Sequence, residues 1–192
     1  MFMRTMRAGP ADRVLDVGVA ADDAGAGNYL EHWYPWPQNL VACGLEGPPA
    51  VCAARGIRFV RADGRKLPLA DQSFDIVHCN AVIEHVGPRD QQRRLIGELL
   101  RVGRRLWITT PDAEGPLEPH TLLPLAHWLP QALRDWVYRA AGRGYYADPR
   151  NLNPLSAQEL RRCFPQPLQN QVIIRRQYLF GLPTVLVACL KK

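Results

Sequence analysis

Five short apolar runs, separated by polar stretches, limit the folds that this chain can adopt. They span residues 13–18, 39–45, 57–63, 74–80 and 105–111, and turn-forming Gly, Asp, Asn or Pro residues bound them. Runs of this length are typical of strands buried on both faces of a parallel sheet. Because parallel neighbours need a crossover between them, we expect five strands in series, with helices or long loops in the intervals.

Helix signals lie between and after these runs. Leu95, Leu99 and Val102 share one helical face between Pro88, which suits a first helical turn, and Gly103, which suits the end. We therefore expect an amphipathic helix before the fifth strand. Further helices are expected at about 130–141 and, behind a capping-box pattern, at about 156–163.

The alternation stops after residue 111. Residues 112–153 are richer in Pro, Trp, His and Leu, and we expect them to form a lid or substrate-binding insertion within a single domain, residues 1–192. Two apolar runs follow, at 171–180 and 184–190, with a tight connection that favours an antiparallel pair. The prediction is an α/β fold: a doubly wound, mostly parallel, seven-stranded Rossmann-like sheet closed by that pair.

Composition excludes several classes of protein. The 192 residues are 47% hydrophobic and 22% charged, as in ordinary folded domains. There is no apolar stretch of about 18 residues and no signal-peptide pattern, so we expect a cytoplasmic protein without a transmembrane segment. The five cysteines lack C-x-x-C spacing, which predicts that most of them are buried thiols and that they form neither a disulfide framework nor a metal site.

The formal charge of +6 comes mainly from arginine pairs spread along the chain. Such a charge can attract phosphates or an anionic surface, or can simply belong to a solvated exterior. Both interpretations remain open, because the pairs do not form one block with interleaved aromatic residues.

Polar groups stand where the predicted strands end. In a doubly wound sheet, ligands bind outside the carboxyl ends of the strands. The predicted ends carry polar or acidic groups, which indicates a ligand site at this edge. The residues concerned are Asp16 and Gly18, Glu46, Asp63 and Gly64, Asn80 to His85, and Thr110.

Three segments carry a resemblance to a known family: VLDVG at 14–18, ADGRKLPLADQSFDIVHCNAVIEHV at 62–86 and WITTP at 107–111. They resemble class I S-adenosylmethionine-dependent methyltransferases, in particular the small-molecule branch. The resemblance covers residues 13–111 well and the closing strand pair loosely. It implies S-adenosylmethionine as cofactor and methyl transfer to a small or amphiphilic metabolite, with oxygen as the expected target atom.

The resemblance also implies roles for individual residues. Glu46 would accept hydrogen bonds from the ribose hydroxyls, Asp63 would accept one from the adenine amino group, and Gly64 would let the backbone approach the base. For the acidic residues, the alternative is that each caps the following helix. The other implied cofactor positions are Asp16 and Gly18 at the amino-acid end, and Asn80, Ala81 and Val82 beneath the adenine and methionine parts.

The loop after the first run departs from the family pattern. The usual G-x-G is missing, and Asp16 and Glu46 are thirty positions apart, against about 20 in comparable units. We predict that residues 19–28 form a lengthened loop, in which Gly25 to Asn28 return to the cofactor. S-adenosylmethionine has no pyrophosphate, so loss of the phosphate nest does less damage than in a dehydrogenase. The aromatic residues Tyr29, Trp33, Tyr34 and Trp36 just behind this loop are expected to belong to the core, with a substrate-binding cluster as the alternative.

Few side chains need to be catalytic, because methyl transfer depends mainly on alignment. His85 is the candidate base, although a structural role in its loop is nearly as well supported. His120 and Trp128, in the 112–153 insertion, are candidate substrate-binding residues; packing of that insertion on the sheet is the alternative.

Rival functions are a non-catalytic, methyltransferase-like binding module with a degenerate cofactor loop, and a nucleotide-dependent oxidoreductase. The missing G-x-G-x-x-G weighs against the oxidoreductase. No Asn-Pro-Pro-Tyr signature of nucleic-acid amino methylation follows the fourth run, so we expect a small-molecule acceptor and no nucleic-acid partner, with a homo-oligomer possible.

Overall fold

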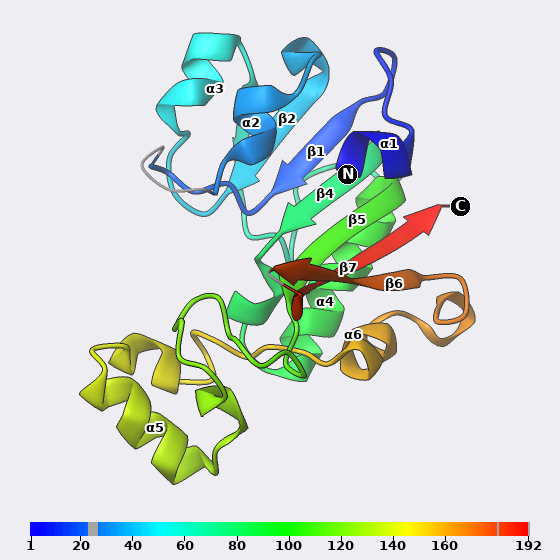
Figure 1. Ribbon diagram of the computed structural model, residues 1–192. Coiled ribbons are helices and arrows are strands. Elements are labelled where there is room, and N and C mark those ends of the chain that lie inside the picture. The colour runs from blue at the N-terminus through cyan, green and yellow to red at the C-terminus, as the bar shows by residue number, and fades with distance from the viewer. Residues whose placement is uncertain (23–26, 180, 192) are drawn as a thin grey trace. The chain divides into compact units, whose positions relative to one another are not determined.

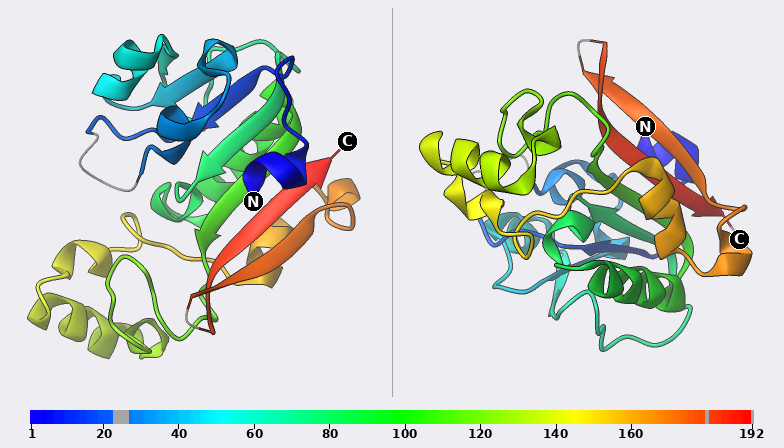
Figure 2. Two further views of the ribbon diagram at one scale, coloured as in Figure 1. Left: turned by 45° about the horizontal axis from the view of Figure 1, so that its top comes forward. Right: turned by 90° about the horizontal axis from the view of Figure 1, so that it is seen from below.

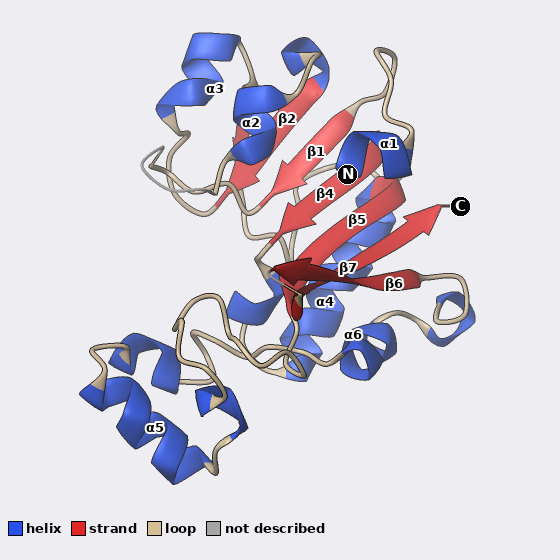
Figure 3. Cartoon of the chain, viewed as in Figure 1, coloured by secondary structure: helices blue, strands red, loops and turns tan. Residues whose placement is uncertain are grey.

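The computed structural model describes residues 1–22, 27–179 and 181–191 (Figures 1 and 3). Its strands are β1 (Val14–Val17), β2 (Leu40–Gly44), β3 (Arg58–Arg61), β4 (Phe74–Asn80), β5 (Gly103–Pro111), β6 (Ile173–Leu179) and β7 (Leu182–Lys191). Its helices are α1 (Phe2–Met6), α2 (Tyr29–Trp33), α3 (Ala50–Arg55), α4 (Arg89–Val102), α5 (Gln131–Ala140) and α6 (Ala157–Cys163). Short 3-10 turns occupy Pro37–Asn39, Ile83–His85, Ala126–Trp128, Gly144–Ala147 and Gln166–Leu168.

The strands form one seven-stranded sheet in the order β3-β2-β1-β4-β5-β7-β6. β1 pairs in parallel with β2 and β4, and β2 pairs in parallel with β3. The predicted α/β class, the parallel series and the closing antiparallel pair are confirmed. β3 differs in one respect: we expected burial on both faces, but its residues are half-buried or exposed, because β3 is an edge strand.

The chain divides into two compact units. The first comprises Met1–Asn80, Arg94–Ile108 and Cys189–Lys192, and the second comprises Ala81–Arg93 and Thr109–Ala188. The second unit therefore contains more than the predicted insertion at 112–153. Whether the chain is a single domain stays a prediction.

Helix α4 follows the sequence prediction closely. Leu95, Leu99 and Val102 are fully buried, and α1 and α4 cover opposite faces of the sheet at β4 and β5 (Figures 1 and 2). The helix ends at Val102. A Cβ on the next residue, Gly103, would lie only 2.4 Å from Cγ2 of Val77, so a larger residue does not fit there.

The second unit is less regular. Its packing centre is the buried set Ala126, Tyr138 and Ala147, contributed by α5 and the turns around it. The predicted capping box is confirmed at α6: the Ser156 hydroxyl accepts a hydrogen bond from the Glu159 amide, and the Glu159 carboxylate accepts one from the Ser156 amide. No helix among the described residues is long and apolar enough to span a membrane.

The lengthened loop is confirmed as far as it is described. Residues 18–22 and 27–28 are not helical, while Gly25 lies outside the described residues. Asn28 is buried and ties the two ends of the loop together: its amide donates to the carbonyl oxygens of Ala20 and Asp22, and its Oδ1 accepts from the Ala20 amide. All five cysteines are buried free thiols, as predicted.

Candidate cofactor site and histidine cluster

The first loop lies tightly against the end of β2 in the first unit. The amides of Gly18 and Val19 both donate to the Cys43 carbonyl, at 2.8 and 3.0 Å. A Cβ on Gly44 would lie 2.5 Å from the Val19 carbonyl oxygen, so this contact requires glycine. Gly18 has φ 102°, in the region that favours glycine. The start of the first loop is therefore packed closely against the end of β2 and fixed by hydrogen bonds, although the loop lacks the usual G-x-G.

Glu46 lies two residues beyond β2 and is exposed. Its carboxylate has no hydrogen bond or ion pair with the residues that the structure describes. The alternative, a helix cap, is not observed, since Pro49 is the N-cap of α3. Glu46 thus offers a carboxylate at a strand end, as a ribose diol requires.

Asp63 lies two residues beyond β3, and its carboxylate holds the turn. Its Oδ1 accepts from the Arg65 amide at 2.9 Å, and its Oδ2 pairs with Arg65 Nη2 at 2.6 Å. The Arg65 guanidinium therefore keeps the pKa of Asp63 below its usual value. Packing favours glycine at position 64, because a Cβ there would lie 2.9 Å from side-chain atoms of both Val17 and Leu95, which would have to move.

Asp16 lies inside the strand, and its carboxylate is bonded to Nδ1 of His78 at 2.7 Å. Sequence reasoning did not single out His78; the available signal was a polar residue inside an apolar strand, two positions from Asn80 on the same face. His78 and Asn80 line a cavity of about 310 Å³ in the first unit. Tyr29 and Trp33 line it too and are 58% and 80% exposed, so their assignment to the core was wrong, whereas that of Tyr34 is confirmed because it is fully buried.

In the second unit, three side chains converge. Nε2 of His85 lies 3.0 Å from Nε2 of His120, and Oε1 of Glu84 lies 4.0 and 3.9 Å from these two nitrogens. Glu84 is fully buried, and its Oε1 has no hydrogen-bond partner among the described residues. Burial raises the pKa of Glu84 to about 7, against the opposing effects of His120 and the Thr110 hydrogen bond.

In both histidines of this cluster, the second ring nitrogen, Nδ1, contacts a neighbouring residue. Nδ1 of His85 lies 2.6 Å from the Asn151 carbonyl oxygen, and Nδ1 of His120 lies 2.6 Å from Oε1 of Glu118. Burial lowers the pKa of His85. Burial would also lower the pKa of His120, but the hydrogen bond and charge of Glu118 outweigh it and raise that pKa.

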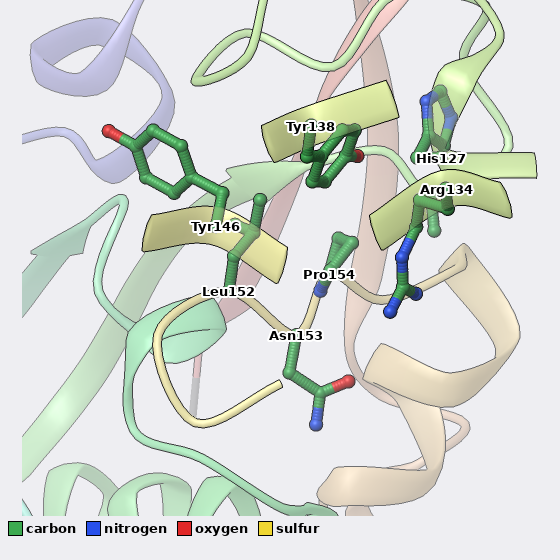
Figure 4. Close-up of a pocket in the computed structure, with 8 residues that line it drawn as sticks. His127, Arg134, Tyr138, Tyr146, Leu152, Asn153 and Pro154 are labelled. Carbon is green, nitrogen blue, oxygen red and sulfur yellow. The ribbon is translucent and has the colours of Figure 1, made fainter. Parts of the chain in front are cut away.

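A second cavity, of about 210 Å³, lies beside α5 (Figure 4). Arg134 and Asn153 supply polar groups, and in the view of Figure 4 the Tyr138 ring lies above Pro154. His127 also lines it, and its two ring nitrogens are buried without a hydrogen-bond partner among the described residues. The remaining lining residues are Ala113, Tyr146 and Leu152.

Other predicted site residues lie in the second unit. Ala81 and Val82 directly follow Asn80, and Ala81 has φ 52°. Trp128 is 52% exposed, and its indole nitrogen donates to the Ala113 carbonyl at 2.9 Å. The structure thus brings His85 and His120 together and leaves Trp128 at the surface.

Comparisons with known proteins agree with this fold. Residues 23–105 match the family model described as a methyltransferase domain. The chain is 29% identical over 172 residues to a demethylmenaquinone methyltransferase of Roseiflexus sp. (strain RS-1), covering 85% of this chain and 66% of that protein. It is 33% identical over 168 residues to an uncharacterized methyltransferase of Mycobacterium leprae (strain TN), covering 82% and 59%. A solved S-adenosylmethionine-dependent methyltransferase from Archaeoglobus fulgidus superposes with a TM-score of 0.60 at 14% identity, covering 100% of this chain and 98% of that one.

Residues 23–105 thus match a methyltransferase-domain family, and the fold is similar to that of a solved S-adenosylmethionine-dependent methyltransferase. The chain spans about two thirds or less of the length of the two curated relatives. The family model and both relatives are named for methyl transfer. They leave the acceptor and the methylated atom open.

Proposed function

We propose that this chain is an active S-adenosylmethionine-dependent methyltransferase whose altered first loop still admits the cofactor. The observation that carries this is at the end of β2, where Gly44 fits against Val19 and the Glu46 carboxylate is exposed beyond it. A degenerate site has no need of this close glycine contact beside an available carboxylate.

The residues at the candidate cofactor site suit S-adenosylmethionine. Glu46 would hold the ribose hydroxyls, Asp63 the adenine amino group, and Gly18 would allow close backbone approach. Asn80 lines a cavity and would contact the methionine part. When bound, S-adenosylmethionine supplies an electrophilic methyl group on a sulfonium. The protein's contribution is to bind and align the two reactants and to exclude water.

Calorimetric titration with S-adenosylhomocysteine tests cofactor binding. Asp63→Ala should weaken binding about tenfold or more, because a hydrogen bond to a charged group contributes about 1.5–3 kcal/mol. Asp71→Ala, which removes a 75% exposed carboxylate from the same unit, is the control and should bind like the wild type. Equal affinities in all three proteins would remove Asp63 from the site, and no binding to the wild type would favour the non-catalytic module.

For the acceptor, we propose a small or amphiphilic metabolite that is methylated on oxygen and bound by the second unit. Its cavity combines apolar walls with a few polar groups, as small-molecule pockets do. The relative named demethylmenaquinone methyltransferase also supports a metabolite acceptor. We retain His85 as the proton acceptor and His120 and Trp128 as substrate residues, and we add His127 because of its unpartnered ring nitrogens.

This assignment is tested with labelled S-adenosylmethionine and a panel of acceptors that includes demethylmenaquinone and simple phenols. Trp128→Ala and His127→Ala should lower methyl transfer while the affinity for S-adenosylhomocysteine stays near wild type. Trp136→Ala, which removes a 64% exposed tryptophan from α5, is the matched control and should remain active. Equal activity of all three variants would exclude this cavity as the acceptor site.

A further inference from the structure

The cluster of Glu84, His85 and His120 has the composition and geometry of a metal site. All three ligand atoms lie within 4.8 Å of one another. We propose that the cluster binds one divalent transition-metal ion, although the sequence analysis predicted no metal site. The proposal concerns ion binding alone and does not depend on methyl transfer.

The distances permit a common centre. Protein nitrogen and oxygen ligands lie about 2.0–2.2 Å from zinc, so two ligands of one ion are at most about 4.4 Å apart. The three separations in the cluster are 3.0, 3.9 and 4.0 Å, and all satisfy this limit. Two imidazoles and one carboxylate are a donor set that suits zinc, iron or manganese.

The hydrogen bonds around the cluster aim lone pairs at that centre. Nδ1 of His85 faces the Asn151 carbonyl and Nδ1 of His120 faces Glu118, so each Nδ1 carries its proton and donates it. In the neutral rings, both Nε2 atoms then present lone pairs to each other. Outer partners of this kind are typical of metal-bound histidines, because they fix the tautomer and the orientation of the ring.

Glu84 supplies the independent observation. Its Oε2 accepts the Thr110 hydroxyl at 2.9 Å, while its fully buried Oε1, directed at the two histidines, has no hydrogen-bond partner among the described residues. A buried carboxylate oxygen without a hydrogen-bond partner destabilises the folded protein, and a bound cation would supply the missing interaction. Without an ion, a proton shared between the two Nε2 atoms is the competing arrangement.

The cluster is closed on one side and open on the other. Glu84 is fully buried, whereas the side chains of His120 and His85 are 20% and 34% exposed. An ion with three protein ligands and an open side keeps positions for water or for a further oxygen ligand. Holding an acceptor oxygen there would be its use in the reaction, and that use alone rests on the proposed function. The ion would occupy the lone pair that His85 otherwise offers as a base.

The test is metal binding by the intact chain, stripped with a chelator and titrated separately with Zn²⁺, Mn²⁺ and Co²⁺. We expect one ion per chain for at least one metal, with affinity reduced at least about tenfold in both Glu84→Gln and His120→Ala. His32→Ala, which removes an exposed histidine in the first unit, is the control and should bind normally. A cobalt complex should also show visible absorption bands that are lost in Glu84→Gln.

Two results would overturn the proposal. One is the absence of stoichiometric binding of all three ions; the other is binding that His32→Ala weakens as much as His120→Ala does, which would indicate adventitious histidine contacts. Circular dichroism of each variant separates lost binding from lost folding, and Glu84→Gln keeps an acceptor for Thr110. Unchanged S-adenosylhomocysteine affinity in Glu84→Gln would separate this result from the proposed cofactor site.

Discussion

The candidate cofactor site of the first unit and the histidine cluster of the second are built in different ways. Glu46 and Asp63 each lie two residues beyond a strand, and their carboxylates are at least partly exposed. Glu84, His85 and His120 instead come from two segments 35 residues apart, and the carboxylate is fully buried. The position of the residues in the first site is set by the ends of strands. The position of the residues in the second site is set by the paths of two loops that bring distant segments together. Substitutions should therefore affect the two sites separately.

The largest effect on the first unit is expected at Gly44. Gly44→Ala would place a Cβ 2.5 Å from a backbone oxygen, and overpacking of this kind lowers the free energy of unfolding by about 1–3 kcal/mol. It should also weaken S-adenosylhomocysteine binding, because the first loop must shift. Gly47→Ala is the control, since nothing lies within 4 Å of its Cβ. Urea unfolding measures the stability of both variants. Similar free energies of unfolding for Gly44→Ala and Gly47→Ala would show that the contact between Gly44 and the first loop is not needed.

A smaller effect is expected at the outer edge of the histidine cluster. Thr110→Val removes the hydroxyl that holds Glu84 Oε2 and keeps the shape of the side chain. Loss of such a partner typically lowers metal affinity about 10- to 100-fold, and we expect the lower end of that range here because the three ligands remain. Titration with the ion that the wild type binds best measures this. Thr184→Val, a buried threonine elsewhere in the same unit, should leave the affinity unchanged.

The smallest effect is a pH-dependent contribution to stability from Glu159. Burial would raise the pKa of this carboxyl, but the Ser156 amide and the Arg89 guanidinium outweigh it and lower that pKa below 4.5. A lowered pKa in the folded state stabilises the protein above pH 4.5, and this contribution is lost as the pH falls through the folded value.

Glu159→Gln should therefore lower the free energy of unfolding at pH 7 by less than about 1 kcal/mol, since the Arg89 pair is partly exposed and screened. The difference from the wild type should shrink in acid. Urea unfolding of both proteins at pH 7 and at a pH below the folded-state pKa of Glu159 checks this difference in stability. A difference that grows in acid would contradict the ion pair between Glu159 and Arg89.

Local patterns were sufficient to predict the sheet, α4 and the α6 capping box. Leu95, Leu99 and Val102 follow helical spacing, and the signals that end a strand or begin a helix lie within a few residues of each other. Strand position in the sheet is not a local property, which is why the exposure of β3 was missed. It depends on which strand lies at the edge.

The sites were predictable to different degrees for the same reason. Glu46 and Asp63 could be chosen because a strand end is visible in the sequence, although the engagement of Asp63 by Arg65 was not. The meeting of His85 with His120 depends on the path of residues 109–120, which no periodicity encodes. His78 was hidden inside an apolar run, so its hydrogen bond to Asp16 was not predicted.

In the proposed function, the strand ends of the first unit hold the cofactor and the histidine cluster does not. Calorimetric titration of S-adenosylhomocysteine into the wild type, Glu46→Gln and Glu84→Gln tests it most directly. We predict that Glu46→Gln weakens binding about tenfold, because a charge-assisted hydrogen bond to the ribose is lost, while Glu84→Gln binds like the wild type. Wild-type affinity in Glu46→Gln, or an equal loss in both variants, would contradict this account.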